Sequence, residues 1–168
     1  MHLLRLTAVL MLAWAFSSPA WAGPDADRAD RYLLGRVVHV HDGDTFAMVR
    51  EDLELVVVRL YGIDAPEAGQ PFGAKSARAL KKMINKKLVL VEVMQKADRY
   101  GRLVGIVRLE DRDINREMVE QGLAWVEHRF CRRKRPCNGY WASVRRAQKD
   151  RRGLWAEQAM PPWEWRKK

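Results

Sequence analysis

Three short segments of this chain bring carboxylates and arginines close enough together to do chemistry. They are Asp-Gly-Asp-Thr at 42–45, the stretch from Arg59 to Glu67, and Asp-Arg-Tyr-Gly-Arg at 98–102. Carboxylate oxygens are the ligands that hard divalent cations prefer, and an arginine can pair with an oxyanion through two parallel donors. Together, the three segments could therefore hold both a divalent cation and a phosphate group.

Each segment taken alone also has a purely structural interpretation. An Asp-Gly pair is an ordinary hairpin-turn signal, and the Asp-Ala-Pro at 64–66 could be a loop whose aspartate bonds the backbone. Residues 98–101 would make an acceptable β-turn. The occurrence of all three segments in one order and spacing favours the chemical interpretation.

This combination resembles the staphylococcal nuclease (thermonuclease) family. The likeness lies in Val-His-Asp-Gly-Asp-Thr at 40–45, Arg-Leu-Tyr-Gly-Ile-Asp-Ala-Pro-Glu at 59–67 and Asp-Arg-Tyr-Gly-Arg at 98–102. Gln-Gly-Leu-Ala at 121–124 and Gly-Leu-Trp at 153–155 add to it, so that it covers roughly residues 35–156. The resemblance implies a calcium-dependent nuclease that hydrolyses phosphodiester bonds of DNA and RNA with low sequence specificity.

The resemblance also implies a metal site made of oxygen ligands. The carboxylates of Asp44 and Asp64 and the main-chain carbonyl of Ala65 would hold a Ca²⁺ ion in an open, partly hydrated site. The family often has threonine at the position of Ala65. Because the ligand there is a main-chain oxygen, alanine should serve equally well. Asp42 is expected to be a turn residue that supports the site rather than a ligand.

Three further residues receive catalytic roles from the resemblance. Arg59 and Arg102 would grip the oxygens of the scissile phosphate as negative charge builds on them. Glu67 would position or deprotonate the attacking water. Each has a structural alternative: an ion pair of Arg59 with Glu54 or Glu92, a rim pair of Arg102 with the nearby Asp98, and a surface or helix-capping role for Glu67.

The aromatic residues are less decisive. Tyr100 matches a family position that contacts the nucleotide, with strand packing as the equal alternative. His128 replaces a tyrosine of the best-known members and is expected to lie on the surface. The three tryptophans at 125, 141 and 155 are expected to belong to the core rather than to stack on bases.

The first 22 residues have the pattern of a cleaved signal peptide. A basic residue, Arg5, precedes an apolar run at 6–16, and Ala-Trp-Ala at 20–22 is a typical cleavage pattern. The run is shorter than the roughly 20 residues that a membrane span needs. We therefore expect a secreted or periplasmic protein with no membrane anchor after cleavage.

The remaining chain is basic and has two cysteines. The formal net charge of the whole chain is +10, and removing the signal takes away only Arg5, so the excess favours a polyanionic partner. Cys131 and Cys137 lie in Cys-Arg-Arg-Lys-Arg-Pro-Cys, and a disulfide is the expected state in an exported chain. Free thiols or a zinc site are the less favoured alternatives. The arginine- and lysine-rich run between the cysteines is expected to be solvated.

The hydrophobic pattern predicts one α+β domain. Alternating or β-rich segments at 35–40, 45–50, 53–63, 88–93 and 103–109 predict five strands. About three helices are predicted, over 74–84, over 115–121 with Gly122 as its stop, and from an Asn138 cap to Gly153 with Trp141, Val144 and Ala147 on one face. This order suits a five-stranded OB-fold-like β-barrel, with a sandwich as the main alternative.

The domain would run over 35–156, after a short lead at 23–34. The tail at 157–168 is expected to lie extended on the surface at its Pro-Pro-Trp. We expect a monomer that takes DNA and RNA as substrates. A catalytically inactive OB-type module that binds nucleic acid, or an exported binder of acidic polysaccharide, would have no use for three carboxylates beside two arginines, so both rank lower.

Overall fold

The computed structural model describes residues 31–132, 136–157 and 159–168. The expected signal peptide lies outside the described residues, and so does the centre of the basic run, residues 133–135. Within the described ranges, no helix is long and apolar enough to cross a membrane.

Five long strands form a closed barrel, as predicted. In the sheet, they follow the order β3-β2-β1-β5-β6, and a parallel pairing of β3 with β6 closes the circle while the other neighbours are antiparallel. The fold is therefore an α+β, OB-fold-like barrel rather than a sandwich. The strands are β1 (Tyr32–Val40), β2 (Thr45–Arg50), β3 (Leu55–Leu60), β5 (Leu88–Gln95) and β6 (Leu103–Leu109).

The barrel is filled by the apolar side chains of these strands. Alternate residues of a strand point to opposite faces, so one set of side chains faces inward while the other faces outward. Helix α2 (Gly73–Ile84) closes the core by burying Leu80, Met83 and Ile84. The core includes, from the strands, Val37, Phe46, Met48, Val58, Leu60, Val89 and Val91.

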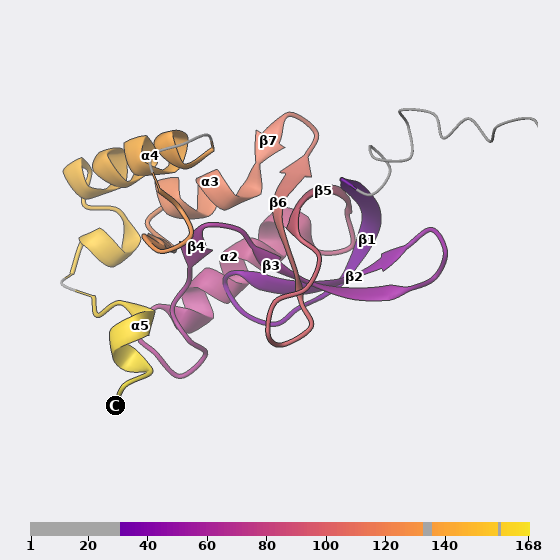
Figure 1. Cartoon of the computed structure of the whole chain (residues 1–168). Helices are drawn as coiled ribbons and strands as arrows, with labels where there is room; N and C mark the ends of the chain where they lie inside the picture. Colours follow the sequence, from indigo (N-terminus) through magenta and orange to yellow (C-terminus); the bar gives the residue numbers. More distant parts are fainter. Residues whose placement is uncertain (1–30, 133–135, 158) are drawn as a thin grey trace, which may run out of the picture.

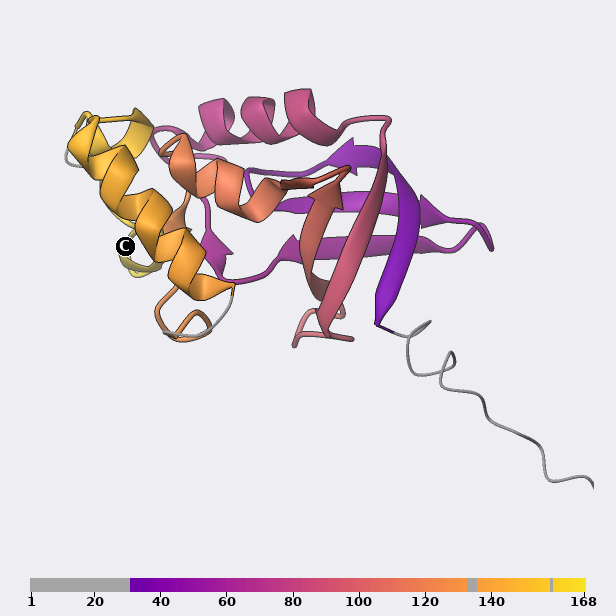
Figure 2. The same cartoon turned by 90° about the horizontal axis from the view of Figure 1, so that it is seen from above.

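The helices lie over one side and one end of the barrel. Figure 2 shows α2 running along the barrel, and in both views α4 and α5 lie at the end opposite the β2–β3 hairpin (Figures 1 and 2). The remaining elements are α3 (Ile114–Glu120), α4 (Cys137–Lys149), the 3-10 turn Gly153–Trp155, α5 (Pro162–Trp165) and three two-residue strands, β4 (Ile63–Asp64), β7 (Arg112–Asp113) and β8 (Trp125–Val126).

Two details of the third predicted helix were wrong. Helix α4 begins at Cys137 with Pro136 at its N-cap, so Asn138 lies inside the helix and does not cap it. The helix ends at Lys149, because the chain must turn before Gly153 to let the Leu154 amide donate to the Gly122 carbonyl at 2.8 Å.

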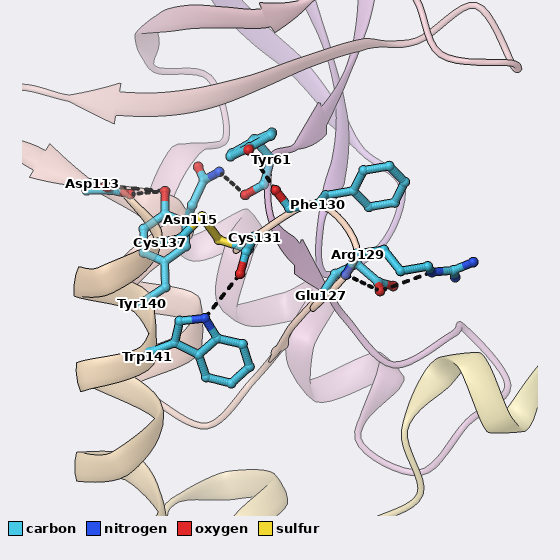
Figure 3. Close-up of a disulfide and its surroundings, with 10 residues drawn as sticks. All are labelled: Tyr61, Asp113, Asn115, Glu127, Arg129, Phe130, Cys131, Cys137, Tyr140 and Trp141. Carbon is cyan, nitrogen blue, oxygen red and sulfur yellow. Dashed lines mark hydrogen bonds and ion pairs between the residues drawn. A yellow bond between two sulfur atoms is a disulfide. The ribbon is translucent and has the colours of Figure 1, made fainter. Parts of the chain in front are cut away.

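The disulfide joins Cys131 to Cys137 and ties the start of α4 to the loop after β8. Its surroundings are drawn in Figure 3, where Trp141 donates its ring N–H to the Cys131 carbonyl at 3.1 Å. The hydroxyl of Tyr61 donates to the Phe130 carbonyl at 2.8 Å in the same loop. The pairing predicted from the sequence is thus present, and side-chain hydrogen bonds also hold the carbonyls of Phe130 and Cys131.

The C-terminal tail differs from the prediction. It is not extended at its Pro-Pro-Trp, because Pro162 opens the short helix α5 and is itself buried. Gln70 donates to the Met160 carbonyl, and the Trp163 ring meets the Trp125 ring edge-on at 6.3 Å. Proline suits the first position of a helix, since its missing N–H would have no helical acceptor there. The tail therefore packs back onto the domain.

Candidate functional site

Asp44 is positioned by the tight loop between β1 and β2. The Asp42 carboxylate accepts a hydrogen bond from the Asp44 amide at 2.9 Å, which is the supporting turn role expected for Asp42. Gly43 faces helix α2 so closely that a Cβ there would lie 2.0 Å from the Ser76 hydroxyl. Glycine is therefore needed for the loop to approach the helix and turn Asp44 inward.

Arg59 and Asp64 meet because the chain reverses between β3 and β4. The turn passes through Gly62 at a φ of +74°, a conformation that favours glycine. Arg59 then donates to the Ile63 carbonyl at 2.8 Å and to Asp64 Oδ1 at 3.0 Å. These backbone and side-chain bonds fix the guanidinium at the mouth of the turn.

Arg59 also joins the two buried aspartates to each other. Its Nη1 lies 3.1 Å from Oδ2 of Asp44, while its Nη2 binds Asp64. The alternative ion pairs do not form, because Glu54 pairs with Arg50 and Glu92 with Arg31. The structure thus brings together three of the residues assigned from the sequence.

Burial shapes the electrostatics of this cluster. Burial raises the pKa of Asp44 to about 6, against the opposing effect of Arg59. The pKa of Asp64 is also raised, first by burial and then by the charge of Asp44, against hydrogen bonding from Arg166. Two desolvated carboxylates that repel each other favour any cation that can enter between them.

Ala65, the third residue expected to supply an oxygen, directly follows Asp64. Its amide donates to Asp44 Oδ2 at 2.6 Å, which places its backbone directly beside both aspartates. Within the described residues, no group of three or more His, Cys, Asp and Glu side chains gathers as a metal cage. The donor set is nevertheless hard and all oxygen, and two carboxylates with a carbonyl fit an open calcium site that water and substrate would complete.

Glu67 lies at the edge of the cluster, and its partner was not predicted. Its carboxylate accepts a hydrogen bond from Nη1 of Arg166, whose Nη2 donates to Asp64 Oδ2 at 2.7 Å. Neither the surface role nor the capping role considered for Glu67 includes this contact. The sequence offered no local signal for Arg166, because it stands next to Lys167 and Lys168 in a short basic tail.

Arg102 lies at the turn before β6, where it pairs with Asp98. Asp98 accepts from its Nε at 2.9 Å and from its Nη2 at 2.7 Å, which is the rim pair considered as the alternative. Tyr100 is 66% exposed, and the guanidinium groups of Arg99 and Arg102 lie over its ring. Tyr100 is therefore not packed into the strand, and its exposed ring lies against two arginines.

The other aromatic residues divide between core and surface. Trp125 is buried, and Trp155 packs against the core while meeting the Trp125 ring at 6.2 Å. His128 is exposed, as expected, and its ring lies 4.3 Å from that of the half-buried Trp141. The predicted face of α4 is confirmed, because Val144 and Ala147 are buried and Trp141 packs against the core.

Comparisons with known proteins show the family of the chain. A family model described as "Staphylococcal nuclease homologue" matches residues 57–157, more than half of the chain. The chain is 36% identical to "Protein ParB" of Escherichia coli, over 98% of this chain and 91% of that protein. It is 40% identical to an "Uncharacterized endonuclease" of Escherichia coli O157:H7, over 80% and 85% of the two chains. With a "Micrococcal nuclease" of Shigella flexneri the identity is 33%, over 90% and 85%.

The chain has an OB-fold-like barrel in which two buried aspartates pair with one arginine, and its relatives include nucleases. The chain belongs to the staphylococcal nuclease family.

Proposed function

We propose that this chain, an endonuclease-type hydrolase of its family, uses calcium to cleave phosphodiester bonds of DNA and RNA with low sequence specificity. The observation that carries the proposal is the contact of Arg59 with both Asp44 and Asp64. A module that only binds nucleic acid would have no use for these carboxylates, because their negative charge repels the phosphate backbone. Further support comes from relatives named as nucleases.

In this proposal, the carboxylates bind the cation and the arginines bind the phosphate. Bound calcium would supply positive charge to the scissile phosphate. Arg59 contributes a buried guanidinium at the same place. Arg102 would leave Asp98 and donate to phosphate oxygens as their charge increases, since paired N–H donors suit a phosphate as well as a carboxylate.

Glu67 would act on the attacking water. Its carboxylate lies beside Asp64 through their common partner Arg166, and its side chain is more than one third exposed. A carboxylate in that position can accept a proton from water that approaches from solvent. Tyr100, exposed and next to Arg102, would stack on a base or donate to a phosphate.

The proposal includes export and action as a monomer. The support for export is the apolar run and cleavage pattern of residues 1–22. The low sequence specificity follows because the cation and the arginines would contact the phosphate backbone, which is the same in all sequences.

The test is incubation of the purified protein with plasmid DNA and with total RNA, in calcium and then in excess chelator. We expect cleavage of both in calcium and loss of activity on chelation. Magnesium should support little turnover, because it gives up its water shell reluctantly. Full activity in chelator would exclude the metal role of Asp44 and Asp64.

A further inference from the structure

The C-terminal tail packs beside the active site through several contacts of different kinds. Met160 accepts a hydrogen bond from Gln70, in the loop between β4 and α2. Trp163 meets the ring of Trp125, which is the residue paired with Asp64 in the β4–β8 ladder. Helix α5 and the loop after β4 are neighbours in Figure 1. The tail is therefore anchored where its last basic residues can reach the aspartates.

Arg166 uses this anchorage to bridge two acidic residues. Its Nη2 donates to Asp64 Oδ2 at 2.7 Å, its Nη1 lies 3.4 Å from Oδ1, and the same Nη1 donates to Glu67. Arg59 already binds Asp64 Oδ1 on the other side. Both oxygens of Asp64 thus have a guanidinium partner.

Arg166 and an entering cation would compete for the same oxygens. A divalent ion needs the carboxylate lone pairs in its own shell, and a guanidinium within hydrogen-bonding distance repels it. Arg166 is the easier of the two arginines to displace. Its side chain is 45% exposed, whereas that of Arg59 is 17% exposed and also bonded to two backbone carbonyls.

We propose that Arg166 is a built-in counter-ion of Asp64 and Glu67, which calcium must displace to enter the site. The tail would then set the calcium affinity of the enzyme and hold the carboxylates in place before the ion arrives. This inference rests on the proposed function in that the entering ion is taken to be calcium. It adds a residue outside the matched nuclease domain to the metal site.

The experiment compares calcium binding to the wild type, Arg166→Ala and Lys167→Ala by titration calorimetry. Lys167→Ala is the matched control, because it removes one positive charge from the neighbouring position of the same tail. Loss of the competitor should lower the calcium Kd of Arg166→Ala by about 10-fold, which corresponds to about 1.4 kcal/mol. The Kd of Lys167→Ala should stay within about twofold of the wild type, as expected for a screened surface charge.

Thermal unfolding provides a second readout that needs no substrate. Without calcium, Arg166→Ala should melt as one folded protein at a lower Tm, because Asp64 and Glu67 lose a partner. At one fixed calcium concentration its Tm should rise more than that of the wild type, since tighter binding to the folded state stabilises it more.

Three outcomes would overturn the inference, and they differ from one another. An unchanged Kd in folded Arg166→Ala would show that the contact does not compete, while the calcium mechanism would stand. A weaker affinity would show that Arg166 orients the ligands and is not displaced. If none of the three proteins binds calcium and the wild type still cleaves DNA in chelator, the proposed metal chemistry fails together with the inference.

Discussion

The guanidinium of Arg166 donates to the carboxylate of Asp64 at 2.7 Å, although 102 positions separate the two residues in the chain. Arg59, only five positions from Asp64, binds its other oxygen. The site is therefore built from one local motif and from the end of the chain. A truncation of the tail would alter the site as well as the surface.

The first prediction concerns Arg102. Replacing it with alanine should lower kcat by on the order of 10³-fold at saturating DNA, because arginines that bind a phosphoryl transition state have effects of this size. The measurement is steady-state cleavage of a fluorescent oligonucleotide in calcium.

Arg99→Ala is the matched control, because Arg99 also lies over Tyr100 and has no part in the assigned chemistry. Its kcat should stay near that of the wild type, with weaker binding and a salt slope reduced by up to about one unit. Near-normal kcat in a folded Arg102→Ala, with binding alone weakened, would assign Arg102 to the binding surface.

The second prediction concerns the disulfide. The double variant Cys131→Ala, Cys137→Ala should lose about 2 kcal/mol of unfolding free energy, because the bond restricts a short loop in the unfolded chain. Urea unfolding of the double variant and of the wild type measures the difference. The kcat should be unchanged, since neither sulfur contacts the aspartate cluster. Equal stability of the two proteins would remove the structural role of the bond.

The third prediction is a pH dependence at Asp113, the N-cap of α3. Its carboxylate accepts a hydrogen bond from the Arg116 amide at 2.9 Å, and burial raises its pKa above the usual 3.8 against that bond and against Arg108. The folded state thus holds the proton more tightly than the unfolded state. The stability it contributes is complete below pH 3.8 and is lost as pH rises through the raised pKa.

Asp113→Asn keeps an acceptor for the cap but cannot ionise. The unfolding free energy of this variant, relative to the wild type, should therefore increase as the pH rises from about 4 and then level off. Urea unfolding at several pH values measures this difference. A difference that stays constant, or that falls as pH rises, would contradict the assignment.

The strands could be predicted because their signals are local, and the aspartate cluster because its motifs resemble those of a known family. Alternating residues marked the strands, and Asp44, Arg59 and Asp64 lie in short motifs around turns that Gly43 and Gly62 make possible. In such motifs, a few neighbouring residues determine where the side chains lie. A barrel was predicted, but its closure by the parallel pairing of β3 with β6 is seen only in the structure.

The tail and the cap of α4 could not be predicted in the same way. Arg166 reaches Asp64 because Pro162 and Trp163 pack the tail against the domain. The residues around Arg166 in the sequence give no indication of a contact with a residue 102 positions away. Asn138 is a good cap by propensity, but the disulfide at Cys137 sets where the helix begins. In both cases a tertiary contact decides against the local pattern.

The central claim is that Asp64 belongs to the catalytic metal site, and relaxation of supercoiled plasmid by Asp64→Asn in saturating calcium tests it most directly. Asp150→Asn is the matched control, because Asp150 is an exposed aspartate that pairs with Arg152. With both variants shown to be folded by thermal melts, we predict that Asp64→Asn loses at least about 10³-fold in cleavage rate, as expected when a metal ligand and its charge are removed. Asp150→Asn should cleave at the wild-type rate. A folded Asp64→Asn that relaxes plasmid as fast as the wild type in calcium would contradict the account.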